Sequence, residues 1–412
     1  MYRLLSNIRA IDLTDERGYL CGSMLGQLGI EVVKVEKPGG DSGRKIAPFY
    51  HDILDSQKSL LWYSYNTNKK GITLDIEKSD GREIFKKLVK TSDFVIESFD
   101  VGYLENLGLG YNDLSEVNKD IILVSISPFG HTGPYKNYKA SGLVASAMGG
   151  MMYVTGEPDR PPVRVSFDQS YVLGSSHAAV GAMIAHYYRE STGKGQWVDT
   201  SVQGSWVTTF VNMMASYEID NLIVRRNGST RTNARYAARL IYPCKDGLIT
   251  FMLQLGHVGA RRNASLVDWM NEEGMADDYI KNIDWALLDR NTATQEDIDA
   301  IEQRIERFFE THTKSELIEG FLRRGIMGLP VSTFADLYNN PQLKDRNFWQ
   351  DISYPELEDT LIHPGAPVVL PGMQWHVDKR APLIGEHNEE IYINELGLSL
   401  KDLVNLKQLG VV

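Results

Sequence analysis

The sequence predicts an α/β fold, with a parallel sheet in its first half and a smaller α+β region behind it. Two observations support this prediction. Short β-branched runs alternate with helical patterns over the first half of the chain, and such alternation is typical of a parallel sheet covered by helices. The character then changes at about residue 225, where an arginine-rich segment begins and the regular alternation ends.

The first three segments establish the parallel sheet. Residues 8–13 form a short apolar run, residues 18–28 have apolar side chains at helical spacing, and residues 31–36 (EVVKVE) are a β-branched strand. A strand–helix–strand unit of this kind takes a right-handed crossover, so its two strands lie parallel. The pattern recurs further along the chain, with a helix expected at 81–90 and strands expected at 71–75, 93–97, 121–127 and 197–202.

The remaining segments complete this domain and add a second one. A helical pattern rich in alanine and glycine covers residues 171–189 and precedes a Thr-Gly-Lys-Gly-Gln turn. A small α+β region is expected from residue 225 to about 335. Residues 336–412 mix proline-rich loops with a final helix at 400–409.

Composition limits the possible functions. The 412-residue chain has 43 basic and 54 acidic residues, a net charge of −11 and no basic block, so neither nucleic acid nor a membrane surface is an expected partner. Two cysteines are too few for a disulfide framework or a cysteine-rich metal site. Because there is no long apolar span and no signal-peptide pattern, we expect a soluble, cytoplasmic protein.

Common catalytic motifs are missing. No G-x-G-x-x-G follows the first strand, and the loop there has Asp15 and Glu16, which would repel a pyrophosphate. The nine histidines lack metal-ligand spacing, and no G-x-S-x-G is present. The sequence therefore does not predict a classical dinucleotide site, a zinc site or a serine hydrolase.

Two basic turns remain as candidate anion sites. Lys37 and Arg44 flank a Gly-Gly turn behind the second predicted strand, and Lys69 with Lys70 stands directly before the third. Such side chains can hold phosphates. Each turn can equally be an ordinary solvated surface turn, and the local sequence does not decide between these two interpretations.

Several motifs, taken together and in order, resemble the family III CoA-transferases of the CaiB/BaiF type, the group that includes formyl-CoA transferase. The resemblance runs along essentially the whole chain. The matching segments are residues 28–36 (LGIEVVKVE), 38–41 (PGGD), 68–75 (NKKGITLD), 107–111 (LGLGY), 149–150 (GG), 192–196 (TGKGQ) and 381–387 (APLIGEH).

The resemblance implies a particular architecture. A large domain on a Rossmann-like sheet would span residues 1–220 and a small domain residues 225–335, and residues 336–412 would return to the large domain. Two chains would interlock, with each active site between chains. A CoA thioester would be a substrate together with a small carboxylic acid, and no tightly bound cofactor or metal is expected.

The resemblance also assigns residues. By motif position, Lys37, Lys69, Phe99 and Lys139 are candidates for CoA contact, and Arg44 joins them from the glycine turn. The charge of the chain agrees with this, because an acidic protein must place cations locally to bind the phosphates of CoA.

The catalytic position departs from the family pattern. Family transferases use an aspartate nucleophile at the start of the helix before the Thr-Gly-Lys-Gly-Gln turn, and here that position falls on Tyr171. A phenol with an ordinary pKa of about 10 cannot replace the carboxylate. The nearest acid is Asp168, which is either a cap for the following helix, in competition with Ser170, or a shifted nucleophile.

Three functions follow from this departure. The family includes two-subunit transferases, among them one for succinyl-CoA and benzylsuccinate, in which only one chain has the aspartate. The leading hypothesis is therefore a non-nucleophilic subunit that interlocks with a catalytic paralogue. The alternatives are a self-sufficient homodimeric transferase that uses Asp168, and a non-catalytic protein that binds CoA thioesters.

Overall fold

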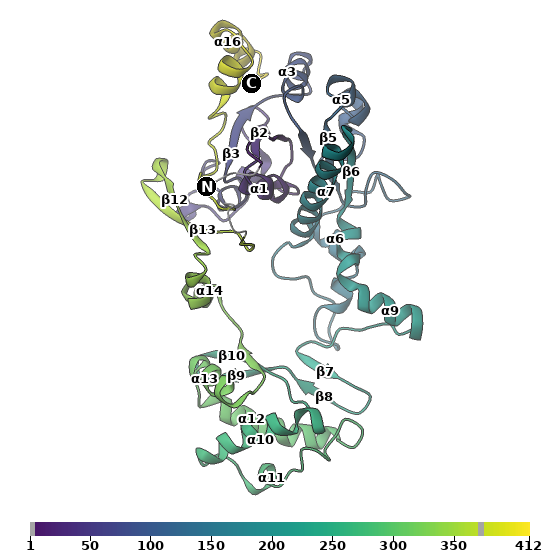
Figure 1. Ribbon diagram of the computed structural model, residues 1–412, viewed down its shortest axis with the longest axis vertical. Helices are drawn as coiled ribbons and strands as arrows, with labels where there is room; N and C mark the ends of the chain where they lie inside the picture. The colour runs from purple at the N-terminus through teal and green to yellow at the C-terminus, as the bar shows by residue number, and fades with distance from the viewer. Residues whose placement is uncertain (1–4, 370–374) are drawn as a thin grey trace. The chain divides into compact units, whose positions relative to one another are not determined.

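The protein is described by a computed structural model that covers residues 5–369 and 375–412. These residues form two compact units (Figure 1). The first contains the chain up to Met152, Arg164–Ile223 and Pro341–Val412, and the second contains Tyr153–Val163 and Val224–Asn340. No helix in the two described ranges is both long enough and apolar enough to cross a membrane.

A six-stranded sheet forms the centre of the first unit. Its strand order is β3-β2-β1-β4-β5-β6, and every neighbouring pair is parallel. This is the strand order of a Rossmann-type sheet, so the predicted α/β fold is confirmed. The strands are β1 (Arg9–Asp12), β2 (Glu31–Glu36), β3 (Lys69–Thr73), β4 (Phe94–Glu97), β5 (Ile122–Ser127) and β6 (Trp197–Ser201).

The alternation of side chains along each strand supplies two cores, one on each face of the sheet. In β2, Val32 belongs to one core, and Val33 and Val35 belong to the other. Helices α1 (Tyr19–Gln27) and α7 (Ser170–Thr192) contribute Leu25, Ala178 and Ala182 to the core that contains Val32.

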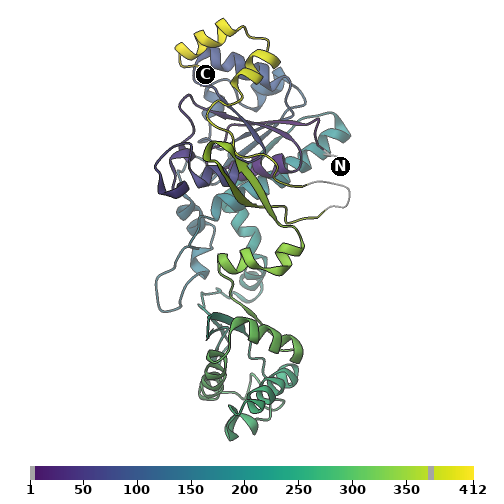
Figure 2. The ribbon, with the colours of Figure 1, turned by 90° about the vertical axis from the view of Figure 1, so that its left-hand side faces the viewer.

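The C-terminal segment helps to cover the opposite face. Helix α3 (Ser79–Val89) and helix α16 (Leu400–Gln408) both contribute to the core that contains Val33, and Figure 2 shows the yellow C-terminal segment beside α3. The backbone N–H of Asp75 donates to the carbonyl oxygen of Val411 at 2.7 Å. The end of the chain is therefore part of the first unit.

Smaller elements complete the first unit. A hairpin of β12 (Trp349–Tyr354) and β13 (Asp359–Pro364) packs against α2 (Leu60–Tyr65), with the Tyr63 and Tyr354 rings 4.6 Å apart. The remaining helices are α4 (Tyr103–Asn106), α5 (Tyr111–Val117), α6 (Gly142–Met148), α8 (Val202–Val207), α9 (Val211–Asp220) and α15 (Pro341–Asp345).

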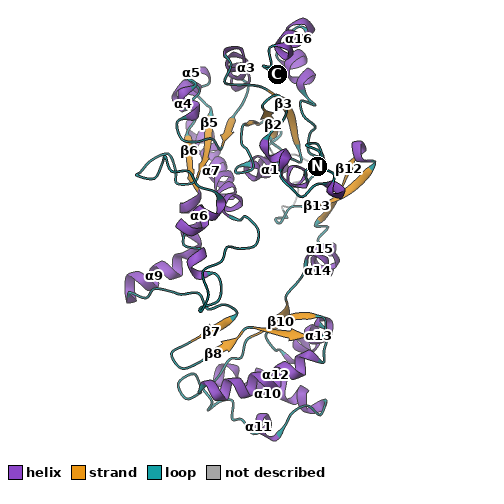
Figure 3. Cartoon of the chain, turned by 180° about the vertical axis from the view of Figure 1, so that it is seen from behind, coloured by secondary structure: helices purple, strands orange, loops and turns teal. Residues whose placement is uncertain are grey.

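The second unit is a small α+β assembly (Figure 3). Its sheets are the antiparallel order β11-β10-β9 and the hairpin β7-β8, packed on helices around an aromatic core that includes Phe251, Phe309 and Phe321. The elements are β7 (Thr230–Thr232), β8 (Ala237–Arg239), β9 (Ile241–Cys244), β10 (Gly247–Phe251), β11 (Gly328–Pro330), α10 (His257–Glu272), α11 (Asp278–Lys281), α12 (Gln295–Glu310), α13 (Lys314–Arg324) and α14 (Phe334–Asn339).

Local signals fix the starts of helices α12 and α13 in this unit. Thr294 caps α12 and Thr313 caps α13, each in a reciprocal capping box with an acidic side chain three residues later. The two helices are separated by Thr311, His312 and the capping residue Thr313.

Candidate functional site

The carboxyl ends of β1 and β4 bring two loops together at the point where the strand order reverses. Parallel α/β sheets bind ligands at such a point, because the loops on either side diverge. Asp15, after β1, and Ser98, after β4, bond reciprocally: the Asp15 N–H donates to Ser98 Oγ at 3.0 Å, and Ser98 Oγ donates to Asp15 Oδ1 at 2.8 Å.

An arginine offsets the acids expected to repel a phosphate in this loop. Arg17 Nη2 lies 2.7 Å from Asp15 Oδ2, and its Nη1 lies 3.8 Å from Asp100 Oδ1. The Arg17 carbonyl accepts a hydrogen bond from Ser175 Oγ at 3.1 Å, which joins the loop to α7. The charge of Arg17 therefore partly balances those of Asp15 and Asp100 at this loop.

Two of the predicted CoA-contact residues, Lys37 and Phe99, lie near the side chains of Glu77 and Tyr103. Lys37 Nζ is 2.8 Å from Glu77 Oε1, and Tyr103 donates its hydroxyl to the same oxygen at 2.8 Å. The Phe99 ring lies 4.4 Å from the Tyr103 ring. Hydrogen bonds from Lys37 and Tyr103 hold the pKa of Glu77 below its usual value. The Lys37 side chain remains 56% exposed and open to a ligand.

Lys139 is the most accessible of the predicted cations. Its side chain is 86% exposed, and its Nζ lies 3.4 Å from Asp100 Oδ2. Asp100 directly follows Phe99, so the structure brings Lys139 to the same loop as Phe99.

Lys69 does not reach this surface. It is a β3 residue, not part of a turn before the strand, and its buried Nζ contacts Asp12 Oδ2 at 2.8 Å, Asn66 Oδ1 at 2.9 Å and the Tyr19 carbonyl at 3.0 Å. Burial lowers the pKa of Lys69 against the attraction of Asp12. Helix α1 approaches the Asp12 carboxylate closely at Gly22. A Cβ at this position would fall 2.3 Å from Asp12 Oδ2, so the approach requires glycine.

Arg44 is likewise committed inside the protein. Its Nε and Nη2 bond to the Glu36 carboxylate at 2.6 and 2.8 Å, and Nη2 also reaches the Pro382 carbonyl at 2.9 Å. The guanidinium stacks over the Trp62 ring at 3.6 Å. Because the side chains of Lys69 and Arg44 are essentially buried, neither is available to a phosphate in this structure.

Tyr171 lines a cavity of about 250 Å³ within the first unit. It lies in the first turn of α7 and donates its hydroxyl to the Ala140 carbonyl at 2.7 Å. Burial raises the pKa of Tyr171 to about 12, although Arg17 favours the phenolate. The phenol is therefore protonated at neutral pH. The other lining residues are Glu16, Leu20, Ile46, Ala47, Leu61, Tyr65, Phe167, Asp168, Val172 and Ser175.

Asp168 lines the same cavity and also supports the start of α7. Its Oδ1 accepts a hydrogen bond from the Ser170 N–H at 3.1 Å, whereas Ser170 Oγ donates to the Gly142 carbonyl at 2.7 Å. The cap position itself, Gln169, makes no side-chain bond. The carboxylate lies against Gly142, where a Cβ would fall 2.0 Å from Oδ2. Asp168 is exposed, so its capping contact leaves it accessible.

A comparison with known families now becomes informative. Residues 5–388 match the family model of CoA-transferase family III. The chain belongs to CoA-transferase family III. The resemblance drawn from the sequence motifs is thereby confirmed.

Relatives within the family include named subunits. The chain is 34% identical to the succinyl-CoA:(R)-benzylsuccinate CoA-transferase subunit BbsE of Thauera aromatica, over 99% of this chain and 98% of that one. It is 27% identical to the succinyl-CoA–L-malate CoA-transferase beta subunit of Chloroflexus aurantiacus, over 99% and 98%. A CaiB/BaiF family protein from Brucella suis has a similar structure, with a TM-score of 0.80 and 26% identity over 95% of this chain and 99% of that one.

Membership of the family makes CoA thioesters the expected substrates of a transferase. Among the residues that the structure describes, no group of three or more His, Cys, Asp or Glu side chains is placed to hold a metal ion.

The sequence analysis missed a buried acid at this end of the sheet. Glu97 ends β4, accepts a hydrogen bond from the Phe99 N–H at 2.7 Å, and lies 3.6 Å from His131 Nε2. Burial raises the pKa of Glu97 to about 7. The signal was present in the sequence, since an acid that ends an apolar strand at the ligand-binding edge of a sheet is a candidate functional group.

Proposed function

We propose that this chain is the non-nucleophilic subunit of a heteromeric CoA-transferase, which moves CoA between succinyl-CoA and a carboxylic acid of the benzylsuccinate type. The observation that supports this most directly is Tyr171. It stands where the family motif expects the aspartate nucleophile, and it is a buried, protonated phenol.

The family chemistry explains why this substitution matters. The aspartate carboxylate attacks the donor thioester, the CoA thiolate leaves, and a mixed anhydride forms. The thiolate then attacks the aspartyl carbonyl, so that the donor acid leaves and an aspartyl-CoA thioester remains, which the acceptor acid resolves in reverse. A phenol has no carbonyl carbon for the thiolate to attack, so Tyr171 cannot form this intermediate.

The relatives support a subunit. Two of the proteins similar to this chain along almost its whole length are named as subunits of succinyl-CoA-dependent transferases. We extend this arrangement to the present chain, with a catalytic paralogue as its partner. The partner's counterpart of Tyr171 would be an aspartate.

CoA would bind at the switch-point loops. Lys139 is an exposed cation beside Asp100, which follows β4. Lys37 is an exposed cation that follows β2 and bonds to Glu77, as Tyr103 does, and the Phe99 ring lies against Tyr103. In this proposal they contact the CoA phosphates and adenine, while the buried Arg44 and Lys69 brace the strands behind them.

A second candidate function rests on Asp168. This carboxylate is exposed and lines the same cavity as Tyr171, so a homodimeric enzyme with a shifted nucleophile remains an alternative. The two functions differ in the effect of Asp168→Asn on CoA exchange. In a complete two-subunit complex, we expect the variant to keep most of its activity. Asp159→Asn is the control, because Asp159 is an exposed acid that does not line the cavity, and it should also keep its activity. A loss of activity greater than about a hundredfold would favour Asp168 as the nucleophile.

The covalent intermediate provides an independent test. After incubation of the complex with succinyl-CoA, intact-mass analysis should find the CoA adduct on the partner chain and none on this chain. An adduct on this chain, mapped to Asp168 by peptide analysis, would contradict the proposal.

A further inference from the structure

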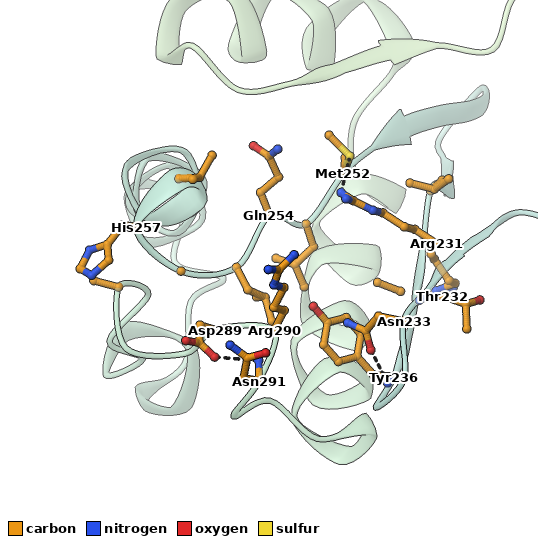
Figure 4. A pocket seen from close by; sticks show the side chains of 18 of the residues that line it. Arg231, Thr232, Asn233, Tyr236, Met252, Gln254, His257, Asp289, Arg290 and Asn291 are labelled. Atoms are coloured by element: carbon orange, nitrogen blue, oxygen red, sulfur yellow. Dashed lines mark hydrogen bonds between the residues drawn. The ribbon is translucent and has the colours of Figure 1, made fainter. Parts of the chain in front are cut away.

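The second unit contains a larger pocket, which is lined by none of the residues named in the proposed function. It has a volume of about 740 Å³, and Figure 4 shows the side chains that line it. Its walls come from the β7-β8 hairpin, from the segment between β10 and α10, and from the loop that follows α11.

Two arginines in this pocket form no direct ion pair with an acid among the described residues. Arg231 and Arg290 both extend toward the middle of the pocket in Figure 4. Within the described part of the chain, neither forms an ion pair within 4.0 Å. Arg231 Nη1 has only the Met252 sulfur at 3.4 Å, which is a weak acceptor.

A third arginine shows the contrast. Arg239 bonds through both Nη atoms to the Glu306 carboxylate at 2.9 and 3.0 Å, and through Nε to Glu302 at 3.2 Å. Hydrogen bonds from Glu306 and Glu302 raise the pKa of Arg239. Arg239 is therefore neutralised by the protein, whereas Arg231 and Arg290 are not.

One oxygen each of Asp289, Asn233 and Gln254, which all line the pocket, is engaged by the protein. Asp289 Oδ1 accepts the Asn291 N–H at 2.7 Å, and this bond, followed by neighbouring bonds and the field of Arg290, lowers the pKa of Asp289. Asn233 Oδ1 accepts two backbone N–H groups, and Gln254 Oε1 accepts a bond from Arg262 at 2.7 Å. The amide nitrogens of Asn233 and Gln254 are thus left as donors, and the pocket offers donors and positive charge.

Apolar side chains stand beside these donors. Val258 and Leu287 line the pocket with 76% and 70% of their surface exposed, and Met252, Leu253 and Leu255 continue the wall. A simple inorganic anion would leave this surface in water, whereas an anion with an apolar body would cover it.

We propose that this pocket binds an organic carboxylic acid with an apolar body, whose carboxylate lies between Arg231 and Arg290. Guanidinium groups match carboxylates in bidentate geometry. The proposal rests on the proposed function for the choice of a carboxylic acid over a phosphate, because acids are the acceptors of a CoA-transferase. The presence of an anion site itself rests on the pocket alone.

Calorimetric titration of the full-length chain with benzylsuccinate, without CoA or partner, tests the proposal. Arg231→Gln and Arg290→Gln should each raise the Kd about tenfold, and the double variant about a hundredfold. Arg235→Gln is the matched control, because Arg235 is exposed on the same hairpin but does not line the pocket. It should bind as the wild type does. The uncharged dimethyl ester should bind much more weakly than the acid.

Each other outcome overturns the proposal. No binding of benzylsuccinate at millimolar concentration, or equal affinity in the wild type and the double variant, removes the site. If CoA displaces the probe from the wild type, and the double variant loses CoA as well, the anion is a phosphate of CoA and the assignment to an acid is wrong. Because the titration contains no partner chain, a failure of the heteromeric subunit proposal would appear in the subunit mass and leave this result unaffected.

Discussion

The cations of the first unit and those of the second are used differently. Arg44 and Lys69 were expected to hold phosphates, yet both are buried and paired with carboxylates. Arg231 and Arg290 are exposed in a pocket and form no ion pair within 4.0 Å among the described residues. A buried charge requires a partner in the protein, whereas an exposed charge is stabilised by water and remains available to a ligand. Burial and pairing, more than position in a motif, separate a structural cation from a binding one.

The largest expected effect concerns the buried pair. Lys69→Ala leaves the Asp12 carboxylate buried without its main partner, and should lower the free energy of unfolding of the first unit by about 3–5 kcal/mol. Lys70→Ala, one residue along β3, is the matched control, because Lys70 bonds to the partly exposed Glu31 and Glu390 and should cost about 1 kcal/mol or less. Urea denaturation measures both. Equal losses would contradict the distinction between structural and exposed cations.

Glu97 extends the comparison from cations to a buried acid, and its effect on stability depends on pH. Its pKa rises from 4.5 to about 7 in the folded chain, so the folded state binds more protons than the unfolded state between these values. Stability from this group is present at pH 4.5 and is lost as pH rises through about 7. Relative to wild type, Glu97→Gln should therefore gain up to about 3 kcal/mol between pH 5 and pH 8.

Denaturation of both proteins across this range measures the gain. His131 lies 3.6 Å from Glu97, so the difference between the two curves reports the carboxyl together with its interaction with this imidazole. A constant difference at all pH values would show that Glu97 is not shifted.

A smaller effect is expected at Tyr171. Tyr171→Phe removes the hydrogen bond to the Ala140 carbonyl and should cost about 1 kcal/mol of stability. Because the phenol takes no part in the proposed chemistry, kcat of the complete complex should remain close to wild type. A large fall in kcat without a matching loss of stability would assign a catalytic role to the hydroxyl.

The smallest effect is expected for the exposed lysines. Lys37→Ala and Lys139→Ala should each weaken CoA binding about threefold, because both lysines are exposed and water screens their charge. The effect should become smaller as the salt concentration rises. Lys194→Ala is the control, since Lys194 lies in the turn before β6, at the opposite end of the strands. If Lys194→Ala weakened binding as much as the others, CoA would not bind at the switch-point loops.

Much of the fold could be predicted from the sequence because strand patterns are local. The strand at Glu31–Glu36 follows directly from residue type and spacing, and the structure gives it the same bounds. The sequence pattern predicts the third strand at residues 71–75, whereas β3 spans Lys69–Thr73. The difference arises because two consecutive lysines are typical of a polar turn. The two side chains point to opposite faces of the sheet, and only the acids at Asp12 and Glu31 show which lysine is buried.

The site was harder to predict because its pairs are distant in the chain. Arg44 pairs with Glu36, which is close in the sequence, but it also contacts Trp62 and the Pro382 carbonyl. The residues around Arg44 do not predict these distant contacts. Of the two pocket arginines, Arg231 belongs to the arginine-rich segment that begins at about residue 225, and Arg290 lies outside it. Whether such a group has a partner depends on residues tens of positions away, as Glu302 and Glu306 do for Arg239.

Native mass spectrometry of the complex purified from its source cells tests the central claim most directly. The account predicts this 46.4 kDa chain together with a different chain of similar size, whose sequence has an aspartate at the counterpart of Tyr171. A homodimer of this chain that is active in CoA exchange by itself would contradict the account and make Asp168 the candidate nucleophile.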